Sequence, residues 1–442
     1  MKIYLTILTV LLITGIVNGK SFPAKTYYVA PKGSDDNPGT IESPFLTIQK
    51  AQTACIPGDT VYIRGGNYVM QSSQIAKTDN LYACVTYLDK SGTEKARINY
   101  LAYPGEKPVF DFSNIAPPGL RITAFLVKAS YVSIKGLDVK GVQVTLTSHT
   151  QSECFRNEGS HNIYEGLSMH DGKANGFYLT KGGNNLILNC DAYNNWDDVS
   201  ENKKGGNSDG FGCHPNSPEY VGNVFRGCRA WFNSDDGFDC INAMAAITFE
   251  NCWAFYNGYS SSFVNLGDGN GFKMGGFGVK SSNRVPAVIP HHQIYFCLAV
   301  GNKNSGFYAN HHLGGDTWYN NTAYKNGVNF NMLNRNAEFT SDVPGYGHIM
   351  KNNLGYKART KEISNVDLLL CDASNNYFQL NTSITDADFL SLKESFLTQK
   401  RSADFSLPMN NFLRLATGSI LIDKGVNVGF SYAGKNPNLG CF

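Results

Sequence analysis

The clearest pattern of apolar and polar positions in this chain is a Gly-Phe pair that returns along its middle. The pair stands at Gly176-Phe177, Gly210-Phe211, Gly237-Phe238, Gly271-Phe272 and Gly306-Phe307. The third residue after each glycine is again apolar. Between the two apolar positions stands a variable residue, which is Tyr178, Gly212, Asp239, Lys273 or Tyr308. This alternation predicts a short β-strand at each pair, with phenylalanine inside and the variable residue outside.

A second repeat runs through the chain from about residue 131 onward. Its fixed position is occupied in turn by Gly136, Gly166, Cys190, Cys228, Cys252, Cys297, Asn321 and Asn353, at intervals of 30, 24, 38, 24, 45, 24 and 32 residues. Five places after five of these positions stand Asn195, Asn233, Asn257, Asn302 and Asn326. Such a period, with strands in every repeat, predicts a solenoid in which the asparagines stack into a ladder.

The spacing inside each repeat decides between kinds of solenoid. Apolar residues recur at every second position, and glycine, asparagine and aromatic residues dominate, so helical repeats and leucine-rich repeats do not fit. We therefore predict an all-β fold, a right-handed parallel β-helix with three strands per coil.

Both ends of the solenoid are expected to be covered. A short helix over residues 45–54 would cap the first coil, whose strands otherwise lack a partner. Beyond Asn353 the repeats fade into a polar region with a short helix near residues 386–397, and the segment from Phe412 onward packs on the last coils. We predict that residues 21–442 form a single domain.

The N-terminal residues have the pattern of a secretory signal peptide. Met1-Lys2 is followed by an apolar run over residues 3–17 and by Asn18-Gly19. The run is short for a bilayer-spanning helix, and no apolar run of that length follows it. We predict a signal peptide over residues 1–20, no membrane span, and a secreted or periplasmic location.

Composition adds little about partners but limits the role of the cysteines. The net charge of +2 favours neither a nucleic acid nor an acidic polymer; we expect no nucleic-acid partner and a monomeric protein. Of the 11 cysteines, Cys213 and Cys240 share the inward position, where a disulfide is possible but not required. Cys55 and Cys84 are a second candidate pair. No Cys-x-x-Cys or Cys/His spacing indicates zinc.

The Gly-Phe strands also predict a charged patch. If they stack about 4.8 Å apart, Asp209, Asp235, Asp236 and Asp239 converge on one outer face next to Lys273. A bend at glycine would turn the acids that precede it outward. Insertions at residues 197–206 and 259–268 enter at the same corner and would form the walls of a cleft.

Four adjacent carboxylates repel one another unless a cation neutralises them. A hard cation with oxygen ligands does so, and Ca²⁺ is the natural occupant in an exported protein. We predict Asp209, Asp235, Asp236 and Asp239 as its ligands, with the carbonyl of Gly237 as a further contact.

Lys273 is predicted to act as a base beside this cation. The cation would lower the pKa of the amine toward the range where its neutral form exists. A base next to a divalent ion suits β-elimination of a polyuronate, in which the ion binds the uronate carboxylate while the amine removes the proton at C5.

At the residues that form this patch, the chain resembles a known family. The segments GNVFRGCRAWFNSDDGFDCINA (residues 222–243), DGNGFKMGG (268–276), NSDGFG (207–212) and YYVAPKGSDDNPGT near the N-terminus are similar to polysaccharide lyase family nine, the pectate lyase group with a right-handed parallel β-helix. The resemblance implies that Asp209, Asp235, Asp236 and Asp239 bind calcium and that Lys273 is the Brønsted base.

Substrate contacts and substrate identity stay open. Residues that could contact the polymer are Tyr178 and Tyr308, and also Arg226, Arg229, Lys303, His311 and His312. We expect a lyase acting on pectic polygalacturonate; the alternative is the rhamnogalacturonan backbone, cut with the same calcium and lysine. Two further functions fit the same fold: a pectin hydrolase that uses paired carboxylates without calcium, and a non-catalytic glycan-binding or adhesin β-helix.

Overall fold

The computed structural model of the protein describes residues 23–278 and 285–442. The predicted signal peptide lies outside the described residues, so it stays a prediction, as do the location and the monomeric state. None of the helices in the described part of the chain has the length and hydropathy needed to cross a bilayer.

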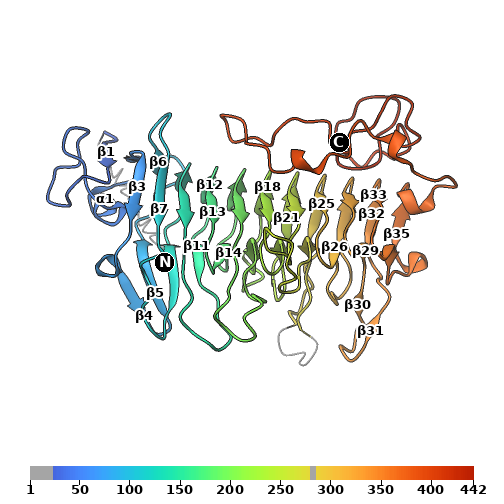
Figure 1. The fold of residues 1–442 in the computed structure, drawn as a ribbon, viewed down its shortest axis with the longest axis horizontal. Coiled ribbons are helices and arrows are strands. Elements are labelled where there is room, and N and C mark those ends of the chain that lie inside the picture. Colours follow the sequence, from blue (N-terminus) through green and yellow to red (C-terminus); the bar gives the residue numbers. More distant parts are fainter. Residues whose placement is uncertain (1–22, 279–284) are drawn as a thin grey trace, which may run out of the picture.

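The chain winds into a solenoid of three sheets in which strands from successive coils lie side by side (Figure 1). Sheet A contains the 12 strands β1 (Thr26–Val29), β2 (Thr60–Ile63), β6 (Ile98–Ala102), β9 (Val132–Lys135), β12 (Ile163–Glu165), β15 (Leu186–Leu188), β18 (Asn223–Arg226), β21 (Ile247–Glu250), β24 (Gln293–Tyr295), β27 (Thr317–Tyr319), β32 (Ile349–Lys351) and β35 (Asp372–Ser374). Sheet B contains the ten strands β3 (Gly66–Val69), β7 (Pro108–Asp111), β10 (Asp138–Lys140), β13 (Ser168–His170), β16 (Asp191–Tyr193), β19 (Arg229–Trp231), β22 (Trp253–Phe255), β25 (Leu298–Val300), β28 (Thr322–Tyr324) and β33 (Leu354–Tyr356).

Sheet C contains the 11 strands β4 (Lys77–Asp79), β5 (Tyr82–Leu88), β8 (Arg121–Val127), β11 (Glu153–Asn157), β14 (Asn175–Leu179), β17 (Phe211–Cys213), β20 (Phe238–Asp239), β23 (Phe272–Lys273), β26 (Ser305–Tyr308), β29 (Val328–Asn331) and β34 (Lys361–Ser364). Neighbouring strands in the three sheets pair in parallel, apart from β4 and β5. A separate antiparallel ribbon joins β30 (Asn334–Arg335) to β31 (Asp342–Val343). The predicted parallel β-helix is confirmed.

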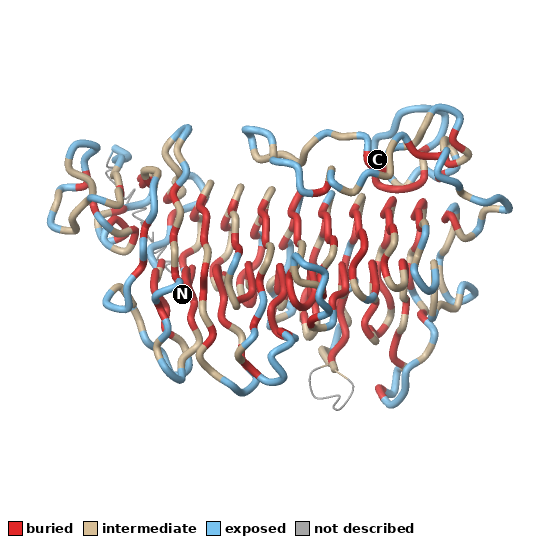
Figure 2. Tube along the Cα trace, in the orientation of Figure 1, coloured by how far each residue is buried: buried red, intermediate tan, exposed pale blue. Residues whose placement is uncertain are grey.

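The Gly-Phe pairs stack directly over one another in sheet C, as the sequence predicts. Phe211 pairs with Phe238, and Phe238 with Phe272. The ring centroids are 4.8 Å apart in both cases, and these phenylalanines are fully buried. The aromatic column forms part of one continuous core that runs along the inside of the coils (Figure 2).

The glycine of each pair leaves space for the neighbouring coil, and at Gly210, Gly237 and Gly271 the backbone also bends. A Cβ on Gly237 would lie 2.6 Å from the carbonyl oxygen of Gly271 and 2.9 Å from Nδ2 of Asn257. Gly237 also does not have a positive φ. The predicted bend is therefore present with an ordinary φ, and the missing side chain also lets neighbouring coils and the asparagine ladder approach closely.

The asparagine ladder is confirmed in detail. Nδ2 of Asn257 donates to Oδ1 of Asn302 at 3.0 Å, and Nδ2 of Asn302 donates to Oδ1 of Asn326 at 2.9 Å. The side chains are fully buried. A second ladder lies where strands of sheet A begin, and there Nδ2 of Asn185 donates to Oδ1 of Asn223 at 2.9 Å. Each asparagine of a ladder forms hydrogen bonds with backbone groups of the turns, which would otherwise be buried without a partner.

The 11 cysteines are all free thiols, ten of them buried. Cys213 and Cys240 are core residues of neighbouring coils without a disulfide. The suggested Cys55–Cys84 disulfide is not formed either, and both thiols are buried.

The coil stack is covered at its first coil and along one side. Helix α1 (Ile48–Ala54) lies beside β1 and buries Ile48 and Ala51 (Figure 1). It starts three residues later than predicted. Short 3₁₀ turns are η1 (Ser72–Gln74), η3 (Leu368–Leu370), η4 (Tyr377–Gln379), η5 (Asp386–Asp388) and η6 (Glu394–Phe396). The predicted helix near residues 386–397 is therefore wrong; two separate 3₁₀ turns stand there.

The C-terminal segment runs back along sheet B with much of its surface exposed (Figures 1 and 2). Buried Asp191 binds both Arg229, from its own sheet, and Arg401, from the segment, at 2.7 Å each. Cys441 donates its backbone N–H to the hydroxyl of Thr322. The segment from Phe412 onward therefore packs on the last coils as predicted, and the residues before it, such as Arg401, reach back to earlier coils.

We expect Asn302→Ala to destabilise the solenoid. The change removes the hydrogen bonds that Asn302 makes with the buried carbonyl of Ala254 and with the backbone and side-chain amides of Asn257, which costs roughly 3 kcal/mol of unfolding free energy. Chemical denaturation followed by circular dichroism measures the loss. Asn114→Ala, at an exposed asparagine, is the control and should change stability little; equal stability of the two variants would contradict a structural role for the ladder.

Candidate functional site

The four predicted aspartates and Lys273 meet on the outside of sheet C. Asp209 comes just before β17, Asp235 and Asp236 come before β20, and Asp239 ends β20. Lys273 in β23 is the direct strand partner of Asp239. Because each strand begins at its phenylalanine, the acids before the glycine belong to the turn, and strand alternation does not direct them inward.

Asp209 and Asp236 occupy rungs of a polar ladder that is built of asparagines elsewhere. The N–H of Asp209 donates to Oδ1 of Asn175 at 2.8 Å, and the N–H of Asp236 to Oδ1 of Asp209 at 3.2 Å. On the next coil, the N–H of Asn270 donates to Oδ1 of Asp236 at 2.6 Å. Each carboxylate thus uses one oxygen for the fold, and its second oxygen is available to the site.

Asp235 and Asp239 are held in the same way by backbone amides. Oδ1 of Asp235 accepts from the N–H of Asp268 at 3.2 Å, and Oδ1 of Asp239 from the N–H of Ile241 at 2.7 Å. The Nζ atom of Lys273 lies 3.0 Å from Oδ2 of Asp236 and 3.1 Å from Oδ2 of Asp239. Five ionisable groups are therefore fixed within one or two coils.

These acids are more deeply buried than an outer patch implies. Asp209, Asp235, Asp236 and Asp239 are only 2%, 6%, 0% and 4% exposed. Burial, followed by repulsion from neighbouring carboxylates, raises the pKa of Asp209 well above its ordinary value and does the same for Asp235. The pKa of Asp236 is also raised, chiefly by burial and against the attraction of Lys273.

The pKa of Lys273 is raised, and not lowered, by its surroundings in the protein alone. Burial works to lower this pKa, but the carboxylates, Asp236 first, outweigh it and hold it well above the ordinary value. The predicted lowering assumed a cation among the acids. One ammonium among four carboxylates leaves an excess of negative charge that favours binding a further cation.

A cavity of about 500 Å³ opens at these residues. Its lining includes Asp209, Asp235, Asp239, Asp268 and Lys273 on one side, and His149, Gln151, Tyr178, Thr180, Asn207, His214 and Asn216 around them. Both insertions reach it. The hydroxyl of Ser234 donates to the carbonyl of Gly205 at 2.7 Å, and an added Cβ on Gly267 would lie 3.2 Å from that carbonyl, so the two loops pack together beside the acids.

Two groups of carboxylates and imidazole lie close enough to share a cation. One oxygen each from Asp209, Asp235 and Asp236 lie within 4.8 Å of one another, and so do ligand atoms of Asp209, His214 and Asp239. The carbonyl of Gly237 accepts the N–H of Phe211 in the sheet at 2.9 Å. A carbonyl oxygen has a second lone pair, so the contact of Gly237 with the ion stays a prediction.

Of the predicted substrate contacts, the two tyrosines lie on strands of sheet C, the sheet that carries the site. Tyr178 lines the cavity, with its ring centroid 5.0 Å from that of His214. Tyr308 is the strand partner of Lys273 on the far side from the cavity, and its hydroxyl lies 3.0 Å from Nε2 of His311.

The basic residues predicted to contact the substrate do not line the cavity. Arg226 lies in sheet A and pairs with Glu250, and Arg229 lies in sheet B and binds Asp191. Lys303 donates to the carbonyls of Leu266 and Gly267, so it holds the second insertion instead of facing the cavity. His312 is fully buried, and His311 pairs with Tyr308 and Asp342. Each of these side chains is used by the fold.

His214 and Asp268 belong to the site although the sequence did not single them out. Both line the cavity, and burial lowers the pKa of His214. Asp268 is visible in the sequence as the end of the second insertion, directly before the segment Gly269 to Gly271. His214 follows a strand with no repeat of its own, so no pattern pointed to it.

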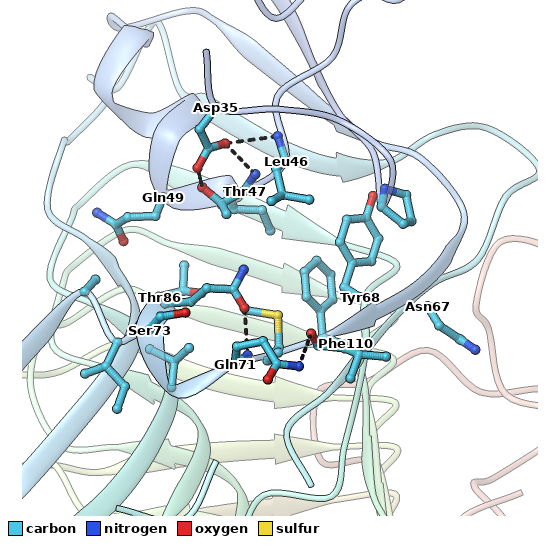
Figure 3. A pocket seen from close by; sticks show the side chains of 18 residues that line it. Asp35, Leu46, Thr47, Gln49, Asn67, Tyr68, Gln71, Ser73, Thr86 and Phe110 are labelled. Atoms are coloured by element: carbon cyan, nitrogen blue, oxygen red, sulfur yellow. Dashed lines mark hydrogen bonds between the residues drawn. The ribbon is translucent and has the colours of Figure 1, made fainter. Parts of the chain in front are cut away.

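A second cavity, of about 490 Å³, lies at the N-terminal end, between the cap and β3. Figure 3 shows its lining, which includes Gln49, Gln71, Tyr68 and Thr86. The oxygens of Asp35 are taken up by the backbone and hydroxyl of Thr47 and the N–H of Leu46 (Figure 3). This cavity lacks the crowded acids of the site in sheet C.

Comparisons with known proteins agree with this geometry. Residues 27–353 match the family model described as Pel9A-like, right handed beta helix region. The chain is 34% identical over 426 residues to pectate lyase L of Dickeya dadantii (strain 3937), covering 95% of this chain and 90% of that protein.

Two solved structures are similar over most of their length. A rhamnogalacturonan lyase superposes with a TM-score of 0.87 at 47% identity, covering 89% of this chain and 97% of that one. The pectate lyase Pel9A superposes with a TM-score of 0.76 at 32% identity, covering 95% and 96%. The matching family model also gives the hand of the coil, which is right-handed. The chain therefore belongs to the Pel9A-like family of right-handed parallel β-helices and is an enzyme, a polysaccharide lyase of family nine.

Proposed function

We propose that the protein is a calcium-dependent lyase that cleaves a galacturonate-containing pectic backbone by β-elimination, with Lys273 as the Brønsted base. The observation that carries the proposal is one amine held 3.0 and 3.1 Å from two of four buried carboxylates. Family membership removes two functions that the sequence alone left open, a pectin hydrolase and a non-catalytic adhesin.

The acids that Lys273 leaves uncompensated fit calcium. Asp209 and Asp235 each have one oxygen bound to a backbone amide and a second that has no partner among the described residues. With Asp236 they offer oxygens within 4.8 Å of one another, a set that suits Ca²⁺. When bound, calcium would neutralise these acids and bind the carboxylate of the uronate.

Lys273 faces the cavity in the position that a base requires. Its Nζ atom takes the proton from C5 of the bound galacturonate, the C5–H electrons form the C4–C5 double bond, and the glycosidic oxygen leaves C4 and is protonated by solvent. Asp236 and Asp239 orient the amine through their Oδ2 atoms. Because the carboxylates raise the pKa of Lys273, the neutral amine forms only when their charge is compensated.

Between the two pectic substrates, rhamnogalacturonan is the better supported. The likeness to the rhamnogalacturonan lyase, at 47% identity, exceeds that to Pel9A, at 32%. Polygalacturonate carries a carboxylate on every sugar, whereas rhamnogalacturonan alternates galacturonate with neutral rhamnose. Among the described residues that line the cavity, Lys273 is the one lysine or arginine, and Gln151, Thr180 and Asn216 in the lining are uncharged. One acidic sugar next to Lys273, with neutral sugars beside it, suits this distribution of charge along the cavity.

Lys273→Ala should abolish elimination while leaving calcium binding intact. Loss of a general base lowers turnover by roughly a thousandfold, and removal of a competing ammonium should tighten calcium binding. Ultraviolet absorbance of the unsaturated product measures turnover, and calorimetry measures binding. Lys204→Ala, at an exposed lysine of the first insertion, is the control. Full turnover by Lys273→Ala would end the proposed mechanism.

Asp236→Asn should lose calcium affinity and lyase activity together without unfolding. Asparagine already occupies the equivalent rungs at 175 and 270, so the amide can accept the N–H of Asn270 as the carboxylate does. Relief of carboxylate repulsion should keep the metal-free variant at least as stable as the wild type. Calcium titration and thermal unfolding check both points. Unchanged calcium affinity would remove Asp236 from the ligand set.

The substrate preference can be measured directly. We expect more unsaturated product from rhamnogalacturonan than from polygalacturonate, and none from either after chelation of divalent ions. The initial rate on each polymer, with and without added calcium, is the measurement. A faster rate on polygalacturonate would reverse the assignment of substrate while leaving the chemistry in place.

A further inference from the structure

A tyrosine, a histidine and a carboxylate form a hydrogen-bonded series that begins beside Lys273. Tyr308 in β26 is the direct strand partner of Lys273. Its hydroxyl lies 3.0 Å from Nε2 of His311, and Nδ1 of the same ring lies 2.8 Å from Oδ1 of Asp342. Arg335 donates to that oxygen at 2.6 Å. The series therefore links a hydroxyl next to the proposed base to a carboxylate on another element.

The backbone is shaped to hold His311 in this series. Asn310 and His311 have φ of 53° and 59°, and among the described residues they are the one consecutive pair without glycine in which both φ values are positive. Such a conformation is uncommon outside glycine and persists only where the surrounding structure holds it. The antiparallel ribbon of β30 and β31, which projects from the coils (Figure 1), pairs Arg335 with Asp342 and so presents the carboxylate to the ring.

The series leads from the half-buried Tyr308 to side chains that contact water. The side chains of His311 and Asp342 are 22% and 42% exposed. Burial works to raise the pKa of Asp342, but the hydrogen bonds from His311 and Arg335 hold it below its ordinary value, so the group is a carboxylate. A carboxylate only accepts, so Nδ1 of His311 carries a proton and Nε2 is the atom that exchanges protons with Tyr308.

The leaving oxygen of the elimination needs a proton donor close to Lys273. C4 is bonded directly to C5, so the departing oxygen is attached to the neighbour of the carbon from which Lys273 takes its proton. Asp239, one strand neighbour of Lys273, is already bound to the amine and to the N–H of Ile241. Tyr308 is the other strand neighbour. Burial raises the pKa of Tyr308 to about 12, against the effect of Lys273, so its hydroxyl keeps its proton until a stronger base, such as a departing alkoxide, takes it.

We propose that Tyr308 is the proton donor to the leaving glycosidic oxygen, and that His311 and Asp342 are positioning residues through which a solvent proton reaches it. As the C4–O bond breaks, the hydroxyl of Tyr308 gives its proton to the departing oxygen. The resulting phenolate takes the Nε2 proton of the His311 imidazolium, and solvent reprotonates the ring. The electrons of the C5–H bond form the double bond, so no further reactant is needed. The inference rests on the proposed function and gives the route of the solvent proton within it.

A change of leaving group tests the role of Tyr308. A glycosidic oxygen needs a proton to leave, whereas fluoride leaves as an anion. The two substrates are rhamnogalacturonan and a pectic oligosaccharide whose non-reducing terminal galacturonate carries fluorine at C4; both give an unsaturated uronate that absorbs in the ultraviolet. Tyr308→Phe keeps the ring and loses the hydroxyl. This variant should lower kcat on the polymer about a hundredfold with little change in KM, and should release fluoride at nearly the wild-type rate.

Two further variants complete the test. Tyr319→Phe is the matched control, because it removes the hydroxyl of another half-buried tyrosine, on sheet A, and should change neither rate. His311→Asn interrupts the route from solvent, and asparagine tolerates the positive φ at this position. It should lower turnover of the polymer about tenfold, a part of what a general acid contributes, and leave fluoride release unchanged.

Full turnover of the polymer by Tyr308→Phe would overturn the proposal. An equal loss on both substrates would also overturn it, because it would indicate a structural role for the hydroxyl. If Tyr308→Phe does not fold, the comparison of both substrates in His311→Asn decides in the same way. Failure of the proposed function is distinguishable, since the wild type would then form no unsaturated product, or Lys273→Ala would keep full activity.

Discussion

The structure depends on a fixed register between neighbouring coils. Parallel pairing brings equivalent residues of successive repeats over one another, as with Phe211, Phe238 and Phe272. Buried side-chain ladders then lock the turns, because an amide oxygen accepts a backbone N–H from a neighbouring coil, as Asn302 does from Asn257 on the preceding coil. Glycines such as Gly237 keep the coils close enough for these bonds. A slip of one coil would leave many buried polar groups unpaired, so any other register between the coils would be much less stable.

The site uses this register by exchanging amides for carboxylates. Asn175 and Asn270 form ordinary rungs, while Asp209 and Asp236 fill the two rungs between them and keep the same hydrogen bonds. The exchange adds charge at positions that are almost fully buried, which raises the pKa of both aspartates. Lys273 compensates part of that charge through Asp236 and Asp239. The remaining negative charge is what makes this part of an otherwise structural ladder suited to a cation.

The sequence predicted the repeat, and with it most of the site, because a solenoid converts spacing along the chain into position in space. The stacking of the Gly-Phe pairs was enough to place Asp239 beside Lys273. Features without a repeat were not predictable in this way. His214 occurs once after its strand, and the pairing of Arg229 with Asp191 and the C-terminal segment depends on a contact between residues far apart in the chain. The predicted lowering of the pKa of Lys273 depends on a cation among the buried acids, whereas in the protein alone the carboxylates raise this pKa.

The central claim is that the carboxylates converge to hold a divalent ion next to the amine of Lys273. Anomalous X-ray diffraction from crystals grown with calcium tests it most directly. The account predicts an anomalous peak bonded to oxygens of Asp209, Asp235 and Asp236, with Nζ of Lys273 facing the same cavity. Diffraction that shows no ion among these acids, or Lys273 turned away from them, would contradict it.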